Sequence, residues 1–196
     1  MSDNYQPALW RSKNLRIMVT CAILVAMSTV LSFIKLPMPW LIWGGSVTLL
    51  SMLPVCLAGL MFGPKWGFGT AFVYSAIQLL VSECFAWGLS PTVLIVCILA
   101  DYLIAFTVLG ITGFFRGRGK TAMCLGVALA AVLRMVCHYI SGVTIWSESM
   151  PDSFSNIWLY SLAYNGSYML PELIFTVAGA VAVLSVPRLI KLIKGN

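Results

Sequence analysis

The sequence predicts an all-α integral membrane protein with six transmembrane helices and with both termini in the cytoplasm. Of the 196 residues, 60% are apolar and only 9% are charged, whereas soluble domains are about a quarter charged. The mean hydropathy is +0.95. The apolar residues gather in six stretches, each close to the roughly 20 residues that a helix needs to cross a bilayer. This composition excludes an ordinary soluble globule and a disordered chain.

Short connections separate the apolar stretches and leave no room for a soluble domain, so we expect a single membrane domain over residues 1–196. Prolines and glycines mark several joints, among them Pro37, Gly63 and Pro64. Pro171 lies inside the last stretch, where neighbouring helices can satisfy the freed backbone groups. The expected spans are residues 17–36, 46–62, 66–82, 92–115, 121–141 and 157–186.

The charged residues predict the orientation. Ten of the 12 lysines and arginines fall on one side of the expected spans, and the two exceptions are Lys35 and Arg134. Because the positive side is cytoplasmic, both termini are expected inside, and topology explains the net charge of +6 without a nucleic-acid partner. The acids Glu83, Glu148 and Asp152 lie at or beyond the outer ends. They favour a cationic solute from outside, although ordinary topology bias explains them equally well.

Three charged residues fall within the expected spans: Asp101, Arg134 and Glu172. A charge at membrane depth costs at least ~2.5 kcal/mol, so each is a candidate functional residue. Counted along their helices, Arg134 and Glu172 both lie near mid-membrane, where they could form a structural ion pair or take part in transport or gating. Asp101 has no lysine or arginine at its own depth. We therefore expect either a carboxylate that waits for a cationic ligand or a hydrogen-bonded structural acid.

Further polar and aromatic residues gather at the outer ends of the spans. His138, Gly142 and Trp146 recur at i, i+4 and i+8, and would line one face if their helix continues that far. Tyr160 and Asn165 open the sixth span at a depth similar to that of Asp101. Aromatic rings beside a carboxylate suit a flat organic cation. The outer tryptophans, which also fit an interfacial belt, are Trp40, Trp43, Trp87, Trp146 and Trp158.

Motifs for catalysis, nucleotide binding and metal binding are missing from the sequence. Residues 117–121 resemble the end of a phosphate loop, but Phe114 stands where that loop needs glycine. One histidine and no C-x-x-C pair leave no metal site. We therefore expect neither an enzyme nor a resident cofactor, so any uphill transport would draw on an ion gradient or a partner. Ala22 and Ala26, four residues apart, either pack internally or let a partner helix approach closely.

Together these residues resemble the thiamine-specific substrate-binding (S) components of energy-coupling factor (ECF) transporters, the ThiT family. The resemblance spans nearly the whole chain. Its most specific segments are Trp43–Pro54, Asp101–Tyr102, His138–Trp146 and Tyr160–Gly166. It implies a six-helix protein of the bacterial plasma membrane that captures thiamine near the outer surface.

The resemblance also implies roles for individual residues. Asp101 would face the positive thiazolium, where known members carry glutamate, with Tyr102 beside it. The segment from His138 through Gly142 to Trp146 would flank the ligand's rings. The hydrogen-bonding partners near the aminopyrimidine would be Tyr160 and Asn165, the tryptophan that covers the pocket would be Trp43 or its neighbour Trp40, and a further aromatic would be Trp87.

Outside the pocket, the resemblance implies that Ala22 and Ala26 dock a transmembrane coupling subunit. Two cytoplasmic ATPase subunits would complete the importer, which fits the missing nucleotide motif. Two alternatives remain open at this point. The chain could be an S component for another vitamin or a thiamine precursor, or an ion-coupled carrier of an organic cation that uses Asp101, Arg134 and Glu172 as a relay. A small intramembrane enzyme would need catalytic constellations that the sequence lacks.

Overall fold

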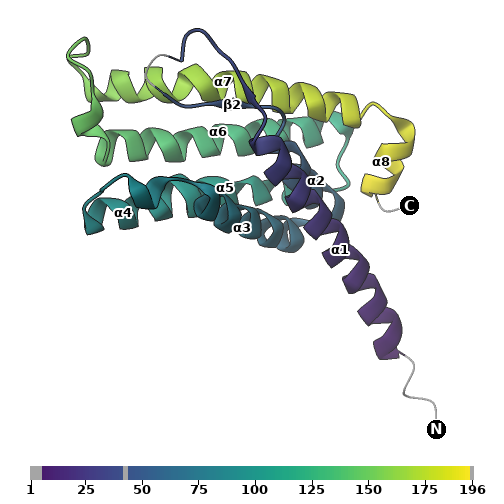
Figure 1. Cartoon of the computed structure of the whole chain (residues 1–196). Helices are drawn as coiled ribbons and strands as arrows, with labels where there is room; N and C mark the ends of the chain where they lie inside the picture. The colour runs from purple at the N-terminus through teal and green to yellow at the C-terminus, as the bar shows by residue number, and fades with distance from the viewer. Residues whose placement is uncertain (1–5, 42–43, 195–196) are drawn as a thin grey trace.

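Helices account for most of the computed structural model, which describes residues 6–41 and 44–194 (Figure 1). The α-helices are α1 (Gln6–Ser32), α2 (Leu53–Phe62), α3 (Pro64–Val81), α4 (Pro91–Cys97), α5 (Ala105–Thr107), α6 (Lys120–Thr144), α7 (Ile157–Val183) and α8 (Pro187–Lys194). A π-helical segment, η2 (Ile98–Ile104), joins α4 to α5, and a 3-10 segment, η3 (Val108–Phe115), follows α5. Shorter 3-10 turns are η1 (Cys84–Ala86) and η4 (Ser147–Ser149).

Five helical stretches of the described chain are long and apolar enough to cross a membrane. They are Lys13–Ser32, Pro64–Ala86, Pro91–Phe115, Lys120–Thr144 and Ile157–Val183, and the shorter apolar helix is Leu53–Phe62. Exposed side chains on these helices include many large apolar ones, such as Val30, Leu80 and Ile174, which suit contact with lipid. The predicted all-α membrane fold is therefore confirmed.

The helix expected over residues 46–62 begins only at Leu53. Residues 47–48 instead form a short strand, β2 (Val47–Thr48), which pairs antiparallel with β1 (Lys35–Leu36). The register places Lys35 opposite Thr48 and Leu36 opposite Val47. Strand pairing satisfies backbone groups that an apolar surrounding would otherwise leave without partners. A helix satisfies the same backbone groups, so the apolar composition of this segment did not show which of the two structures it forms.

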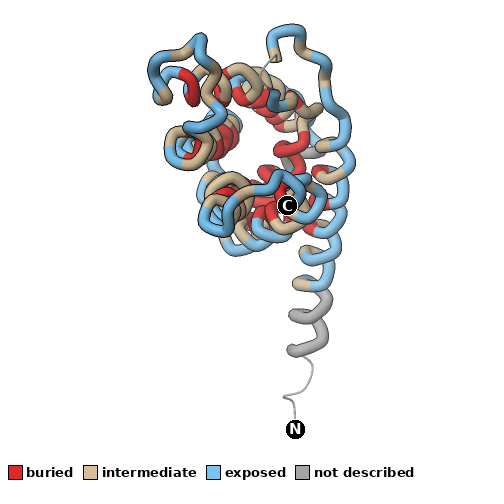
Figure 2. The backbone as a smooth tube through the Cα atoms, turned by 60° about the vertical axis from the view of Figure 1, so that its left-hand side comes forward, coloured by how far each residue is buried: buried red, intermediate tan, exposed pale blue. Residues whose placement is uncertain are grey.

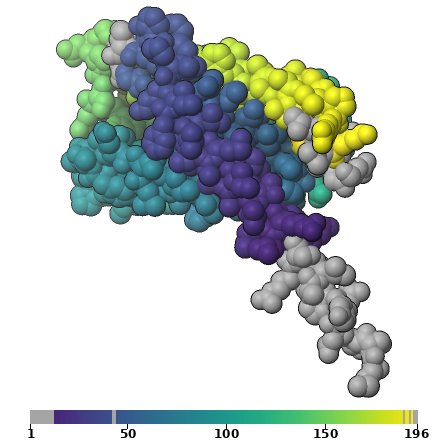
Figure 3. Space-filling model, turned by 45° about the vertical axis from the view of Figure 1, so that its right-hand side comes forward, coloured from purple at the N-terminus to yellow at the C-terminus, as the bar shows by residue number. Residues whose placement is uncertain are grey.

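The helices pack around a common interior with their buried residues turned inward (Figure 2). α6 runs along α7, while α3 packs against α2 and η3. Glycines allow the second set of contacts: a Cβ at Gly110 would collide with the backbone of Phe68, and one at Gly113 would collide with Pro64. α1 crosses the outside of the bundle obliquely and contacts α2 and α3 (Figure 3).

The two ends of the bundle differ in charge. α6 begins with Lys120 at the end that also holds α8 with Arg188 and Lys191 (Figure 1). The connections that contain Glu83 and Glu148 lie at the opposite end, where α4 begins. The charge asymmetry used to predict the orientation thus corresponds to two opposite ends of the folded chain.

Candidate ligand-binding cavity

A cavity of about 740 Å³ lies between α3, η2, α6, α7 and the β1–β2 pair. Its lining runs from exposed residues such as Lys35 and Glu83 to the buried Arg134 and Glu172, so it leads from one end of the bundle into its interior. This volume lies within the roughly 300–1,000 Å³ typical of small-molecule sites. The expected site residues that line it are Asp101, Tyr102, His138, Gly142, Trp146, Tyr160 and Asn165; Trp43 lies outside the described residues.

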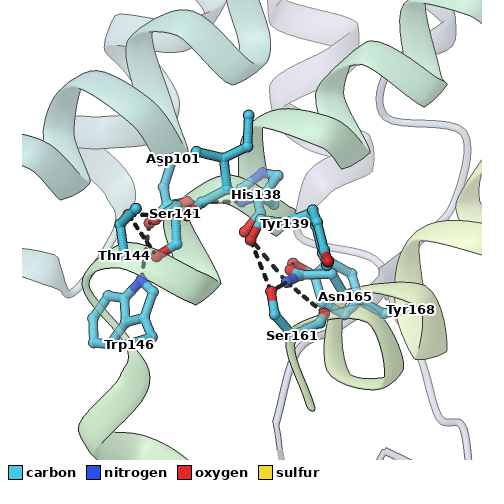
Figure 4. A network of polar contacts seen from close by, with 10 residues as sticks. Asp101, His138, Tyr139, Ser141, Thr144, Trp146, Ser161, Asn165 and Tyr168 are labelled. Atoms are coloured by element: carbon cyan, nitrogen blue, oxygen red, sulfur yellow. Dashed lines mark hydrogen bonds and ion pairs between the residues drawn. The ribbon is translucent and has the colours of Figure 1, made fainter. Parts of the chain in front are cut away.

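Asp101 reaches the cavity from the π-helical segment η2. Single turns of π-helix occur frequently at functional sites because they shift side chains relative to a regular α-helix. The carboxylate of Asp101 faces three donors (Figure 4). Oδ1 lies 3.1 Å from Nδ1 of His138, while Oδ2 accepts from Oγ of Ser141 at 2.7 Å and from Nε1 of Trp146 at 3.1 Å.

Asp101 thus has hydrogen-bond partners within the protein, as one of the two expected outcomes required. The depth comparison considered only lysine and arginine, whereas an imidazole, a hydroxyl and an indole supply the hydrogen bonds. These donors lower the cost of holding a carboxylate at this depth. Because a carboxylate has about four acceptor positions, roughly one remains for a ligand. Asp101 is thus fixed in position and still able to attract a cation.

His138 links Asp101 to the interior of the cavity. Its Nδ1 faces Asp101, and its buried Nε2 has no hydrogen-bond partner among the described residues. A neutral ring that donates from Nδ1 leaves Nε2 as an acceptor. His138 can therefore orient the carboxylate from one side of its ring and accept a hydrogen bond from the other.

Trp146 does not continue the face of α6 as the spacing suggested. The helix ends at Thr144, and the N–H of Ile145 bonds to the carbonyl of Ser141 at 2.9 Å. Trp146 lies beyond this end and turns back to donate to Asp101. Ser141, which sequence reasoning missed, lies three residues after His138 on the same helix face. The i, i+3 spacing was the signal that could have identified it.

Trp87 and Trp40 take different positions. Trp87 lines the cavity, and its ring packs edge to face against that of Trp146 with centroids 5.7 Å apart. Trp40 is half exposed and is absent from the lining. Its Nε1 donates to the carbonyl of Ser167 at 3.0 Å. That carbonyl is the one that Pro171, which lacks an N–H, leaves free four residues earlier in α7.

α7 contributes a row of tyrosines and one amide. The rings of Tyr160, Tyr164 and Tyr168 follow one another with centroids 5.9 and 5.8 Å apart. Asn165 is buried: its Nδ2 faces the carbonyl of Ser161 at 3.0 Å, and its Oδ1 accepts from the hydroxyl of Tyr168 at 2.8 Å. Asn165 is therefore held in one orientation, and its Oδ1 keeps a second lone pair.

Gly142 lets α6 approach α7 closely. A Cβ at this position would collide with Oγ of Ser161 and lie 3.2 Å from Nδ2 of Asn165. Ser161 itself donates to the carbonyl of Tyr139 on α6 at 2.9 Å. Gly142 thus sets the distance between the helices that carry His138 and Asn165.

The innermost part of the cavity holds the pair formed by Arg134 and Glu172. Nη1 of Arg134 lies 2.6 Å from Oε2 of Glu172, and the guanidinium lies 4.5 Å from the ring centroid of Phe106. Oε1 of Glu172 accepts from the N–H of Thr48 at 2.9 Å and from its hydroxyl at 2.5 Å. The predicted pairing of Arg134 with Glu172 is confirmed. Its link to β2 was not foreseen.

Ala22 and Ala26 lie on the outward face of α1, where both are exposed. The face of α1 that turns to the bundle carries the buried Cys21, Val25 and Ser28. Internal packing is therefore not what the pair does, and both positions are accessible to a neighbouring helix. Among the described residues, there is no group of three or more histidine, cysteine, aspartate or glutamate side chains that could hold a metal ion.

Comparisons with known proteins agree with the resemblance seen in the sequence. The family model described as thiamine transporter protein (Thia_YuaJ) matches residues 18–191. The thiamine transporter ThiT of Bacillus subtilis (strain 168) is 29% identical over 197 residues, which cover 92% of this chain and 97% of that protein. ThiT of Lacticaseibacillus paracasei is 29% identical over 98 residues, covering 44% of this chain and 48% of that protein.

The fold also matches a solved structure. ThiT from Listeria monocytogenes superposes with a TM-score of 0.73 at 22% sequence identity, over 92% of this chain and 98% of that chain. The shared fold includes nearly the whole helical bundle. Since the family model covers most of the sequence, the chain belongs to the thiamine transporter protein family of multi-pass membrane proteins.

Proposed function

We propose that the chain is the thiamine-binding S component of an ECF-type importer and that thiamine occupies the 740 Å³ cavity. The observation that supports this most directly is the oriented carboxylate of Asp101 in a cavity lined by aromatic rings. Thiamine carries a permanent positive charge, so a site of low dielectric cannot neutralise it by removing a proton. A fixed counter-charge is the remaining way to offset its desolvation.

In this proposal the rings around Asp101 hold the flat parts of the ligand. Trp146 bonds to the carboxylate, Trp87 packs on Trp146, and Tyr160 also lines the cavity. Each cation–π contact contributes about 0.5–2 kcal/mol. Asn165 meets the aminopyrimidine. Its amide N–H groups are engaged by Ser161 and the carbonyl of His138, so it accepts a hydrogen bond at Oδ1 from the exocyclic amino group rather than donating one.

Transport would depend on partner proteins. The sequence carries no nucleotide-binding motif, so ATP would be hydrolysed by two cytoplasmic ATPase subunits. The exposed Ala22 and Ala26 on α1 are the proposed contact for the transmembrane coupling subunit, because small residues four apart allow close helix approach. The basic end of the bundle, with both termini, would face the cytoplasm, and the cavity mouth with Glu83 would face outward.

A thiamine titration of the purified protein, followed by tryptophan fluorescence, tests the binding proposal. We expect Asp101→Asn to weaken binding by about 2–5 kcal/mol, which is typical of truncating one partner of a buried charge pair. The matched control is Glu148→Gln, which removes an exposed acid of the same end that does not line the cavity. Absence of thiamine binding by the unmodified protein would overturn the proposed function. Unchanged affinity of Asp101→Asn would remove Asp101 from the site.

A further inference from the structure

The segment 44–48 contributes one wall of the cavity that Asp101 and its partners also line. Gly45, Ser46 and Thr48 belong to the lining. Gly45 has a φ of +79°, and any Cβ there would collide with the ring of Tyr168 on α7. The wall therefore lies directly on α7, and its backbone follows a path that favours glycine.

One side chain fixes the inner end of this wall. Oε1 of Glu172 accepts both the backbone N–H and the hydroxyl of Thr48, at 2.9 and 2.5 Å. The other oxygen of Glu172 pairs with Arg134 at 2.6 Å. Glu172 is only 3% exposed. With both oxygens engaged in a buried setting, this carboxylate joins three elements: β2, α6 and α7.

We propose that Thr48 and Glu172 are positioning residues for the ligand cavity: Glu172, oriented by Arg134, holds the wall at residues 44–48 in the conformation that retains thiamine. The inference rests on the proposed function. If the wall is already ordered, thiamine binding does not carry the entropy cost of ordering it. We call the hydrogen bonds between Glu172 and Thr48 the anchor. Loss of the anchor should therefore mainly raise the dissociation rate of thiamine, since most changes at binding surfaces act on dissociation.

The anchor is inseparable from the buried ion pair for a physical reason. A carboxylate inside the membrane is stabilised only while its acceptor positions are satisfied. Releasing Thr48 would leave Oε1 of Glu172 without the two donors that it has among the described residues. The same group that pairs with Arg134 thus resists movement of the wall. This assigns the pair a role beyond joining α6 to α7.

The test compares Thr48→Val with Thr48→Ser in the purified full-length protein. Valine has the shape of threonine and replaces the hydroxyl with a methyl group, whereas serine keeps the hydroxyl and loses the methyl group. Thiamine dissociation is measured by stopped-flow tryptophan fluorescence, and hydrogen exchange of residues 44–48 is measured without ligand. We expect Thr48→Val to dissociate about tenfold faster, which corresponds to about 1.4 kcal/mol. Its association rate should stay unchanged, and Thr48→Ser should resemble the unmodified protein.

Hydrogen exchange separates failure of this inference from failure of the proposed function. Faster exchange at residues 44–48 in Thr48→Val, with α6 unaffected, supports the anchor even if thiamine is not the ligand. Unchanged exchange, or unchanged dissociation in a protein that binds thiamine, overturns it. Should Thr48→Val not fold, Glu172→Gln serves instead: glutamine keeps an acceptor oxygen on only one of the two sides that face Thr48 and Arg134, and the charged guanidinium competes with Thr48 for it. The same increases are therefore expected, and their absence overturns the anchor.

Discussion

The hydroxyl of Ser141 lies 2.7 Å from the carboxylate of Asp101 and donates to the oxygen that also accepts the indole N–H of Trp146. Two donors on one oxygen fix the plane of the carboxylate, and Nδ1 of His138 faces the other oxygen. The charge that we propose for thiamine recognition is therefore oriented before any ligand arrives. Such preorganisation reduces the free-energy cost of ordering the site when the ligand binds.

Ser141→Ala should weaken thiamine binding without unfolding the protein. Removing the hydroxyl takes away one of three donors and frees the carboxylate to rotate. Hydrogen bonds to charged groups contribute about 1.5–3 kcal/mol, so we expect roughly a tenfold loss in affinity or more, measured by fluorescence titration. Thr144→Ala is the matched control, because its hydroxyl bonds only to carbonyls of α6 among the described residues. Equal affinities for the two variants would contradict the role of Ser141.

Gly142→Ala should lower the melting temperature, because its Cβ would force α6 away from Ser161 on α7. Overpacking of this kind typically costs about 1–3 kcal/mol. The control is Gly69→Ala in α3, where nothing lies within 4 Å of the added Cβ and alanine is the better helix former. Thermal unfolding in detergent distinguishes them. A Gly142→Ala protein as stable as Gly69→Ala would show that the helices separate without cost.

Glu172→Ala should destabilise the protein strongly, since it leaves the buried guanidinium of Arg134 and both donors of Thr48 without their acceptor. Removing one partner of a buried pair costs about 3–5 kcal/mol. The double variant Arg134→Met with Glu172→Gln should recover much of this loss, because the uncompensated charge disappears and the glutamine carbonyl can still accept from Thr48. Thermal unfolding of the single and double variants checks the prediction, and a double variant less stable than Glu172→Ala would contradict it.

Counting residues along the expected spans was sufficient to pair Arg134 with Glu172 and to bring Asp101, His138 and Asn165 into one cavity. These results follow from helix rise and membrane depth, which vary little between proteins. The partners of these residues depend on tertiary structure. Thr48 bonds to Glu172 from β2, a segment whose apolar composition predicted a helix. The position of Pro171 in the sequence predicts a helix carbonyl without its usual N–H donor. Only the fold shows that Trp40 donates to this carbonyl.

The π-helical segment that carries Asp101 could not be predicted from the sequence either. A run of apolar residues continues evenly from α4 through η3, and nothing in its periodicity marks the wider turn at Ile98–Ile104. The segment packs against α3 and α6, and these contacts lie far away in the sequence. Spacing could place Ser141 on the helix face of His138, but only the fold shows that Ser141 and Trp146 both donate to Asp101.

Enlarging the outward face of α1 should separate binding from transport. Ala22→Leu and Ala26→Leu add bulk at two exposed positions of α1. We expect thiamine affinity and melting temperature to stay unchanged, because neither position lines the cavity. Uptake and co-purification with the coupling and ATPase subunits should fall sharply, since small residues four apart are what permit close helix contact.

The control for this last change is Ile23→Leu, which keeps a large apolar side chain at the exposed position between the two alanines. A lipid-facing surface tolerates any apolar side chain equally, whereas a docking surface distinguishes alanine from leucine. If the alanine variants assemble and transport as well as Ile23→Leu, this face of α1 contacts only lipid, and the partner must dock elsewhere on the bundle.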